Sequence, residues 1–91
     1  MHLTGIIQSA DLVENPPGSD QVEMILRVQG VKPGQPRRLV IPFPLLVSDP
    51  TLDPDAIRGH GFAAEVAEEA EGRWVVGQIA VASGRVLRPE E

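Results

Sequence analysis

The residues of this sequence that could bind a ligand are four basic side chains and one indole. Arg27 lies in a segment of alternating apolar and polar residues, and Lys32, Arg37 and Arg38 follow it closely. Guanidinium groups pair with phosphate oxygens and stack on nucleobases. Trp74 is the single tryptophan, and an exposed indole stacks on a base for about 1–3 kcal/mol. The candidate binding residues are therefore Arg27, Lys32, Arg37, Arg38 and Trp74.

The charge of the whole chain opposes nucleic-acid binding. The 91 residues include 8 Lys and Arg against 13 Asp and Glu, which gives a formal net charge of −5. A nucleic-acid binder usually carries a basic surface. Aromatic residues, which stack on bases, are only Phe43, Phe62 and Trp74. Any binding of nucleic acid is therefore expected to be weak.

Residue patterns typical of catalysis are absent from the sequence. There is no cysteine, so disulfides and thiolate chemistry are excluded. The serines have no G-x-S-x-G context, and GVKPGQP lacks the Gly-Lys-Ser/Thr ending of a phosphate-binding loop. We predict a protein that is not an enzyme, has no catalytic residues and needs no cofactor.

Metal binding is not expected either. Two histidines far apart in the sequence, without cysteine, do not make a zinc site. His60, between two glycines, could be a metal ligand or a pH-sensitive group, but we interpret it as an exposed loop residue. The acidic residues of segment 65–71 could bind a cation, but we interpret them as a solvated hairpin that keeps the domain soluble; they are Glu65, Glu68, Glu69 and Glu71.

A hairpin of two strands is predicted to position the arginines. Residues 22–29 alternate between two faces, and the apolar face consists of Val22, Met24, Leu26 and Val28. A turn centred on residues 33 and 34 would pair Val28 with Leu39 and Gln29 with Arg38. Both strands then put their apolar faces on the same side. Arg27 and Arg38 would therefore point outward together.

One further strand precedes this hairpin, and the second strand of the hairpin runs into two prolines. LTGIIQSADLV, residues 3–13, is predicted to be a strand with a bend or bulge at Gly5. The strand after the hairpin loop places Leu39, Ile41 and Phe43 on one face. Prolines at positions 42 and 44 cannot donate to a ladder, so this strand must end, bulge or lie at an edge there.

The second half of the chain is predicted to contain one short helix and a final hairpin. Asp53 is a suitable N-cap, with Pro54 at the first helical position and Gly59 at the end. Residues 62–67 alternate as a strand, EAEG is a turn, and WVVGQIAV is a strand with Trp74 facing outward. A helix over residues 63–70 remains the alternative, because Ala and Glu are helix formers. Residues 86 and 87 would extend the last strand or dock the C-terminus.

The order strand, strand, strand, short helix, strand, strand predicts an all-β single domain over residues 1–91. A five-stranded Greek-key barrel of the oligonucleotide/oligosaccharide-binding (OB) type, with the helix between strands 3 and 4, has this layout. LTGIIQSADLV resembles the first strand of bacterial single-stranded DNA-binding proteins and their primosomal relatives. IRGHGFAAEVAE is similar to the passage from helix to fourth strand in that family. The resemblance implies a role with single-stranded DNA in replication or repair, and it is compatible with an oligomer.

The function predicted from these residues is weak binding of single-stranded nucleic acid. OB-folds bind ligands on the face of strands 2 and 3, where Arg27 and Arg38 are expected. The flanking loops ENPPGSDQ and EEAEGR are acidic and would repel phosphates. The alternative interpretation is that the two arginines face solvent near Glu23 and that Trp74 seals the end of the barrel.

A protein partner is the second prediction. The strand faces assigned as outward carry apolar residues, namely Ile25, Val40, Val76 and Ala80. Monomers rarely leave such strips exposed. This predicts a homo-oligomer or a docking site on a replication or repair assembly. An OB module for protein interaction that binds no nucleic acid is therefore the alternative function, and a small-molecule or carbohydrate ligand is a third.

The compartment is predicted from absences. No apolar run approaches the roughly 20 residues of a membrane span, and the N-terminus lacks a positive region followed by an apolar stretch. We therefore expect a cytoplasmic protein with no membrane partner.

Overall fold

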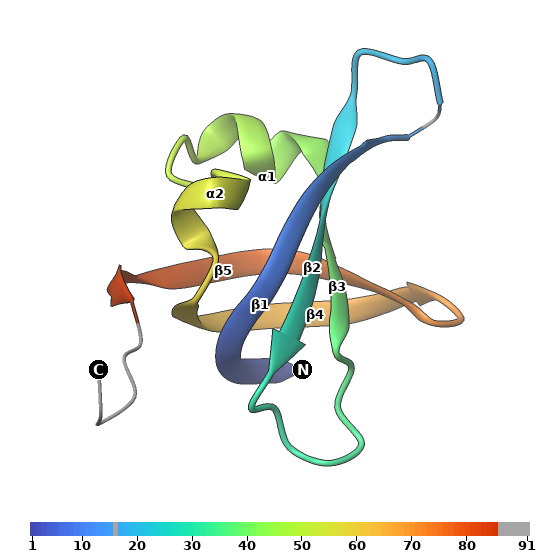
Figure 1. The fold of residues 1–91 in the computed structure, drawn as a ribbon. Helices are drawn as coiled ribbons and strands as arrows, with labels where there is room; N and C mark the ends of the chain where they lie inside the picture. The colour runs from blue at the N-terminus through green and yellow to red at the C-terminus, as the bar shows by residue number, and fades with distance from the viewer. Residues whose placement is uncertain (16, 86–91) are drawn as a thin grey trace.

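Five strands and two short helices make up the fold in the computed structural model, which describes residues 1–15 and 17–85. In chain order the elements are β1 (His2–Glu14), β2 (Val22–Gln29), β3 (Arg38–Ile41), α1 (Phe43–Ser48), α2 (Pro54–Ile57), β4 (His60–Ala70) and β5 (Arg73–Arg85). Figure 1 shows β1, β2 and β3 crossing in front of the β4–β5 hairpin, with both helices above it. The prediction of a mostly β fold with five strands is confirmed.

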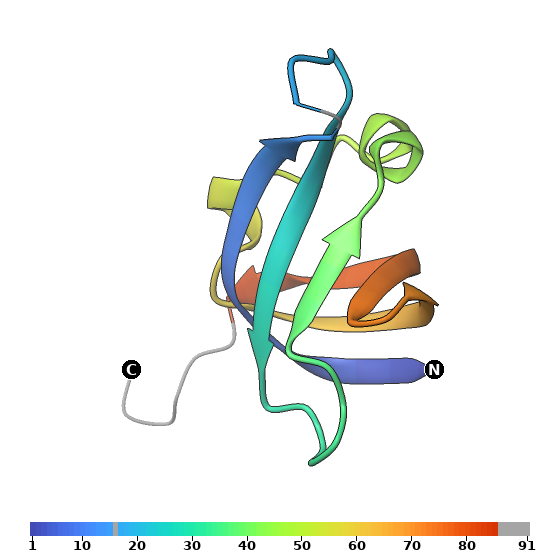
Figure 2. The same ribbon diagram turned by 90° about the vertical axis from the view of Figure 1, so that its right-hand side faces the viewer.

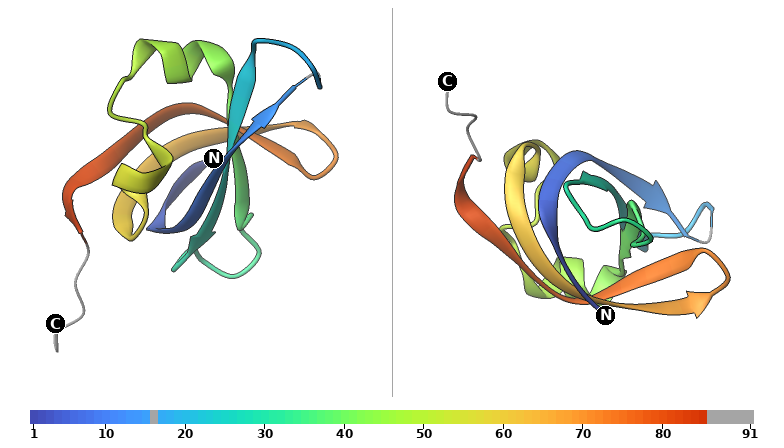
Figure 3. Two further views of the ribbon diagram at one scale, coloured as in Figure 1. Left: turned by 45° about the horizontal axis from the view of Figure 1, so that its top comes forward. Right: turned by 90° about the horizontal axis from the view of Figure 1, so that it is seen from below.

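The five strands form one sheet that closes on itself in the order β1-β2-β3-β5-β4. Neighbouring strands are antiparallel, except that β3 meets β5 in parallel at the single pair Val40–Val75. β1 is long enough to pair with two strands, with β4 through residues 2–6 and with β2 through residues 6–14. Figure 2 shows β1, β2 and β3 side by side, and Figure 3 shows β1 curving round from these strands to β4.

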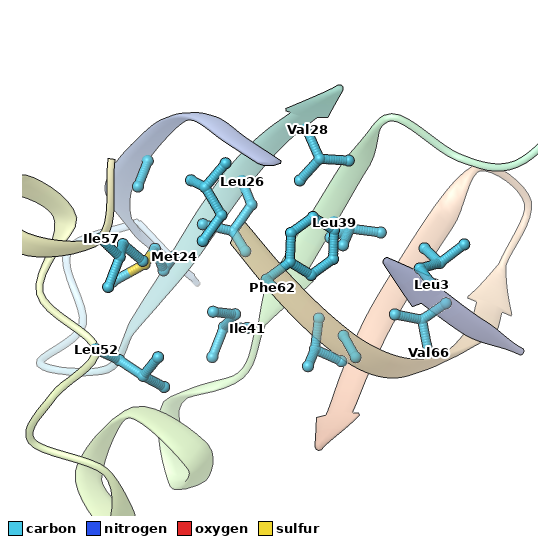
Figure 4. Close-up of a cluster of buried hydrophobic side chains, with 14 residues drawn as sticks. Leu3, Met24, Leu26, Val28, Leu39, Ile41, Leu52, Ile57, Phe62 and Val66 are labelled. Carbon is cyan, nitrogen blue, oxygen red and sulfur yellow. The ribbon is translucent and has the colours of Figure 1, made fainter. Parts of the chain in front are cut away.

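The core lies inside this closed sheet and is entirely apolar in the described residues. Alternate residues of β2, β3 and β4 point into it, as Figure 4 shows. Its largest fully buried side chains are Leu3, Ile7, Met24, Leu26, Val28, Leu39, Ile41 and Val76. The predicted inward face of β2 is confirmed at Met24, Leu26 and Val28. Ile57 of α2 and Leu52 before it close one end of the core.

The predicted short helix is confirmed as α2. The Asp53 carboxylate accepts hydrogen bonds from the backbone N–H groups of Asp55 (2.9 Å) and Ala56 (3.3 Å), as an N-cap should. The expectation of a single helix was wrong, as was the placement of Phe43 on the strand face with Leu39 and Ile41. The expected interruption of the third strand at Pro42 is confirmed. β3 ends at Ile41 and α1 begins at Phe43, because Pro42 cannot donate to the ladder and a proline is accepted in the first helical turn.

Residues 63–70, for which a strand and a helix were both considered, belong to the strand β4. β4 buries Phe62, Ala64 and Val66 and leaves the alternate residues more exposed, so the helix alternative for residues 63–70 was wrong. The predicted outward position of Trp74 on β5 was also wrong. A bulge places Val76 opposite Val66 and leaves Gly77 without a partner, which reverses the faces of the residues before it. Val76 is consequently core, and Trp74 packs against the core.

The hairpin of β2 and β3 forms, but the predicted pairing is displaced by two residues. Leu26 lies opposite Leu39, and Arg27 lies opposite Arg38. The turn does centre on residues 33 and 34, since the Gln35 N–H donates to the Lys32 carbonyl at 3.1 Å. Between the pair Arg27–Arg38 and the turn centre, the loop has five residues on the β2 side, 28–32, and three on the β3 side, 35–37. Because a shift of two preserves which side chains point inward, the predicted faces were still correct.

Two further predictions concern the ends and the environment of the chain. Residues 86 and 87, expected to extend the last strand or dock, lie outside the described residues. Among the helices that the structure describes, neither has the length or apolar character needed to cross a bilayer.

Candidate functional site

The strongest local charge on the outer face of the sheet comes from two arginines on neighbouring strands. Arg27 of β2 and Arg38 of β3 are directly opposite each other, and both side chains are exposed. Side chains in such a pair have Cβ atoms about 4.5–5.5 Å apart, and like charges there are destabilising. The two strands therefore hold two positive charges together against their mutual repulsion.

Arg37 and Gln8 join this pair around one shallow hollow of about 270 Å³, which we call the arginine pocket. It is lined by Gln8, Arg27, Val28, Arg37 and Arg38. The Val28 N–H donates to the Arg37 carbonyl at 2.9 Å, which fixes Arg37 beside β2. Gln8 is the unpaired residue where the β1–β2 register shifts between Ile7 and Ser9. Such a bulge re-aims a side chain, and sequence reasoning missed Gln8 because nothing in QSADLV marks the shift.

The charges of the arginine pocket are not neutralised by any carboxylate that the structure describes. The ion pairs in residues 1–15 and 17–85 involve Arg58, Arg73, His2 and the N-terminal amine, and none involves Arg27, Lys32, Arg37 or Arg38. The interpretation in which Arg27 and Arg38 face solvent agrees with their exposure, but Glu23, on the same face of β2, pairs with Arg73 and not with them.

Glu23 sits on the same outer face of β2, farther from the hairpin loop, and binds Arg73 of β5. Arg73 donates to one of its oxygens, and Asn15 Nδ2 donates to the other at 3.0 Å. Burial by itself would raise the pKa of the Glu23 carboxyl, but the hydrogen bonds from Arg73 and Asn15 outweigh it and lower the pKa. The pKa of Arg73 is raised by its hydrogen bond to Glu23. This pair links the start of β5 to β2.

Lys32 lies on the hairpin loop and does not line the arginine pocket. Its backbone N–H donates to Gln35 Oε1 at 3.0 Å, and Gln35 Nε2 donates to the His2 carbonyl at 3.4 Å. Gly34 has φ +86°, a conformation that glycine adopts without strain, as the third residue of such a turn requires. The loop thus presents Lys32 to solvent below β2 and β3.

Trp74 is not available on the arginine face. It is half-buried and packs against the core, so the interpretation in which Trp74 seals one end of the barrel is supported. The structure therefore brings together Arg27, Arg37 and Arg38. It separates them from Trp74, whose side chain points to the opposite face of the sheet.

The apolar strip predicted on the outer face is mostly covered. Val40 and Val76 are buried, and Ile25 is half-buried. Among the described residues, the large exposed hydrophobic side chains are instead Met1, Leu12, Val13 and Val47. Val40 thus packs where β3 meets β5 at Val75, Val76 belongs to the core, and Ala80 is the one residue of the predicted strip that is exposed.

The remaining hollows and titratable groups offer less chemistry. A larger groove of about 730 Å³ runs between α1 and the β4–β5 hairpin, but its lining is mainly proline, leucine, valine and alanine. His60 is half-buried at the start of β4, not in an exposed loop, and its Nδ1 donates to the Ala82 carbonyl at 2.8 Å. Within the described ranges, no three His, Cys, Asp or Glu residues are arranged to hold a metal ion.

Comparison with known proteins does not assign a family or a function to this chain. No protein-family model, no curated protein and no solved structure matches this chain.

Proposed function

We propose that this chain is a non-enzymatic OB-fold module that binds single-stranded nucleic acid weakly through Arg27, Arg37 and Arg38. The strand order β1-β2-β3-β5-β4 and the helices between β3 and β4 support the OB assignment. The proposed binding face is the outer side of β2 and β3, which is the ligand face of that architecture. Fold alone does not imply function, so the proposal depends on the site.

The observation that carries the proposal is the un-neutralised arginine pair. Placing Arg27 opposite Arg38 costs stability in the absence of an anion. A bound phosphate would convert this repulsion into charge-assisted hydrogen bonds. Arg37 adds a third guanidinium to the same hollow. A planar guanidinium also stacks on a base, which compensates in part for the inward position of Trp74.

Weak binding follows from the surroundings of this pocket. Glu68 and Glu69 lie on β4 and Glu71 in the turn that follows, Glu14 ends β1, and Asp20 lies in the loop after it. A strand that extends from the pocket toward these residues is repelled over about one Debye length, roughly 10 Å at 0.1 M salt. With a net charge of −5, no long-range attraction assists the encounter.

A titration with fluorescently labelled poly-dT at about 50 mM salt tests the proposal, because electrostatic binding is strongest at low salt. We expect binding that weakens as salt rises, and Arg38→Ala should weaken it further. Arg58→Ala is the matched control, because Arg58 is an exposed arginine of the same charge that pairs with Asp55 and does not line the arginine pocket. Absence of binding at this salt concentration refutes the proposal, as does equal loss in both variants.

We further propose that two copies of the chain associate through the free edge of β5. Beyond the pair Val40–Val75, residues 78–81 have a strand partner only on the β4 side. The segment GQIAVA contains no charge and no proline, the residues that usually protect an edge. Two such edges can pair antiparallel about a two-fold axis with no like charges opposed.

The alternative function, a protein-interaction module that binds no nucleic acid, is favoured by one feature of β1. Leu12 and Val13 are adjacent and exposed by 52% and 42%. As consecutive residues of a strand they point to opposite faces of β1, and a partner that covers this end of β1 would bury one or both of them. The same poly-dT titration separates the two functions, because only the first predicts binding that depends on Arg38.

A further inference from the structure

We infer that the arginine pocket binds a single terminal phosphate, so that the module prefers the phosphorylated end of a strand to its interior. The inference rests on the proposed function and names the part of the nucleic acid that the site selects. Its basis is the distribution of charge over the outer face of β1, β2 and β3.

The cations of this face converge on one point. Arg27, Arg37 and Arg38 border the same hollow of about 270 Å³, which is smaller than the roughly 300–1,000 Å³ of pockets that enclose a whole small molecule. A hollow of this size suits one phosphate group. A site that follows a strand would instead spread its cations along a groove.

The next outward position of β2 beyond Arg27, in the direction away from the hairpin loop, carries no positive charge. Successive outward residues of a strand are about 6.6–6.8 Å apart, and the outward residue after Arg27 in this direction is Ile25. Asp11 of β1 lies opposite Ile25, and Glu23 follows. The next phosphate of a strand running this way would therefore meet an apolar side chain and a carboxylate.

In the opposite direction, toward the hairpin loop, the sheet surface ends. Beyond Arg27, β2 ends at Gln29, and Gly30 turns away with φ +80°. Only the loop residue Lys32 offers a further cation there. A strand can consequently enter from the side of the hairpin loop and end in the pocket, but it gains no cation by continuing past Arg27 toward Glu23.

A terminal phosphate matches this pocket better than an internal one. A phosphate monoester carries a charge of about −1.5 to −2 at pH 7 and three acceptor oxygens, as phosphoserine does, whereas an internal diester carries one charge. Three guanidinium groups and the Gln8 amide provide more donors than one diester can use. The additional charge should therefore strengthen binding at this site.

The test compares three single strands of dT10: one with a 5′ phosphate, one with a 3′ phosphate and one with neither, each labelled at its centre, at pH 8 and 50 mM salt. We expect a phosphorylated strand to bind about tenfold tighter or better than the bare strand, the increment of one charge-assisted hydrogen bond. Arg38→Ala and Arg27→Gln should each abolish this preference, and Arg58→Ala should retain it. The preference should also fall at pH 5, because the second ionisation of a phosphate monoester has a pKa near 6.

The possible failures are distinguishable. Equal binding of all three strands, weakened by Arg38→Ala, overturns the end preference and leaves the proposed function standing. Absence of binding by every strand overturns both. Displacement of the phosphorylated strand by inorganic phosphate at equal concentration also overturns the inference, because the site would then select the anion and not the strand end. Circular dichroism of both variants checks that they fold.

Discussion

Two residue pairs on the outer face of β2, one exposed and one half-buried, behave in opposite ways. Arg27 lies opposite another arginine and forms no ion pair with a carboxylate of the described residues, whereas Glu23 forms an ion pair with Arg73. The first arrangement costs stability and leaves charge free for a ligand. The second fixes the start of β5 on β2 and stabilises the fold. The division of this face into a binding part and a structural part is therefore set by single residues.

The Glu23–Arg73 pair should make stability depend on pH in the acid range. Because the folded-state pKa of Glu23 lies below its ordinary value, the pair stabilises the protein above about pH 4.3, the unfolded value. This contribution is lost as pH falls through the lower, folded-state pKa. Glu23→Gln should thus lower the free energy of unfolding at pH 7, by up to about 1 kcal/mol for a solvent-screened pair.

Urea unfolding at pH 7 and pH 3 measures the effect of Glu23→Gln. At pH 3 the difference between the variant and the wild type should shrink, because pH 3 is below the unfolded-state pKa and unfolding then takes up a proton at Glu23. Glu71→Gln is the control, since Glu71 is exposed and forms no ion pair within the described residues. A stability difference that is the same at both pH values would show that the charge of Glu23 is not the cause.

At the scale of elements, β1 depends on one glycine. Ile6 is the residue at which β1 passes from β4 to β2, and Gly5 precedes it. A Cβ at Gly5 would collide with the Gln29 carbonyl oxygen and lie 3.3 Å from the Phe62 ring. Gly5→Ala should therefore destabilise the protein by about 1–3 kcal/mol, the usual cost of overpacking.

Gly77→Ala is the matched control for this prediction. A Cβ there would approach the Glu65 carbonyl oxygen at 3.9 Å, which is an ordinary contact, and Gly77 has no positive φ. The midpoints of urea unfolding of the two variants provide the comparison. If Gly5→Ala is as stable as Gly77→Ala, β1 can bend without a glycine at this position.

The elements that could be predicted are those determined by alternation. The inward faces of β2 and β4 follow from the period of two in Met24–Val28 and Phe62–Val66, and the start of α2 follows from Asp53 and Pro54. The bulge at Gly77 leaves no comparable pattern, because both Val75 and Val76 are apolar. That one insertion decided which way Trp74 points, so the predicted stacking residue was misplaced.

The candidate site was predicted in part for the same reason. The outward position of Arg27 and Arg38 depends only on parity, which survives an error of two residues in register. The involvement of Gln8 depends on an irregularity in the pairing of β1 with β2. The separation of Lys32 from the pocket depends on the unequal arms of the hairpin loop. These features arise from packing between strands distant in sequence and have no local signal.

At the scale of the whole molecule, net charge and the free edge of β5 act in opposition. Two copies of a chain with a charge of −5 repel each other, and the repulsion is screened beyond about 10 Å at 0.1 M salt. Electrostatic repulsion between the two copies is weakest where their uncharged segments, residues 77–82, approach each other. Association through β5 should therefore strengthen as salt rises, whereas binding of nucleic acid should weaken.

Light scattering at high micromolar concentration and 0.3 M salt tests this association. We expect a mass of twice the 9.8 kDa of the chain. Ala80→Lys should yield the monomer, because Ala80 is exposed on β5 and a two-fold axis through this segment would bring the two lysines together. Ala67→Lys, exposed on β4 and away from the free edge, should remain dimeric. A wild-type monomer under these conditions refutes the dimer, and a dimer unaffected by Ala80→Lys places the contact on another surface.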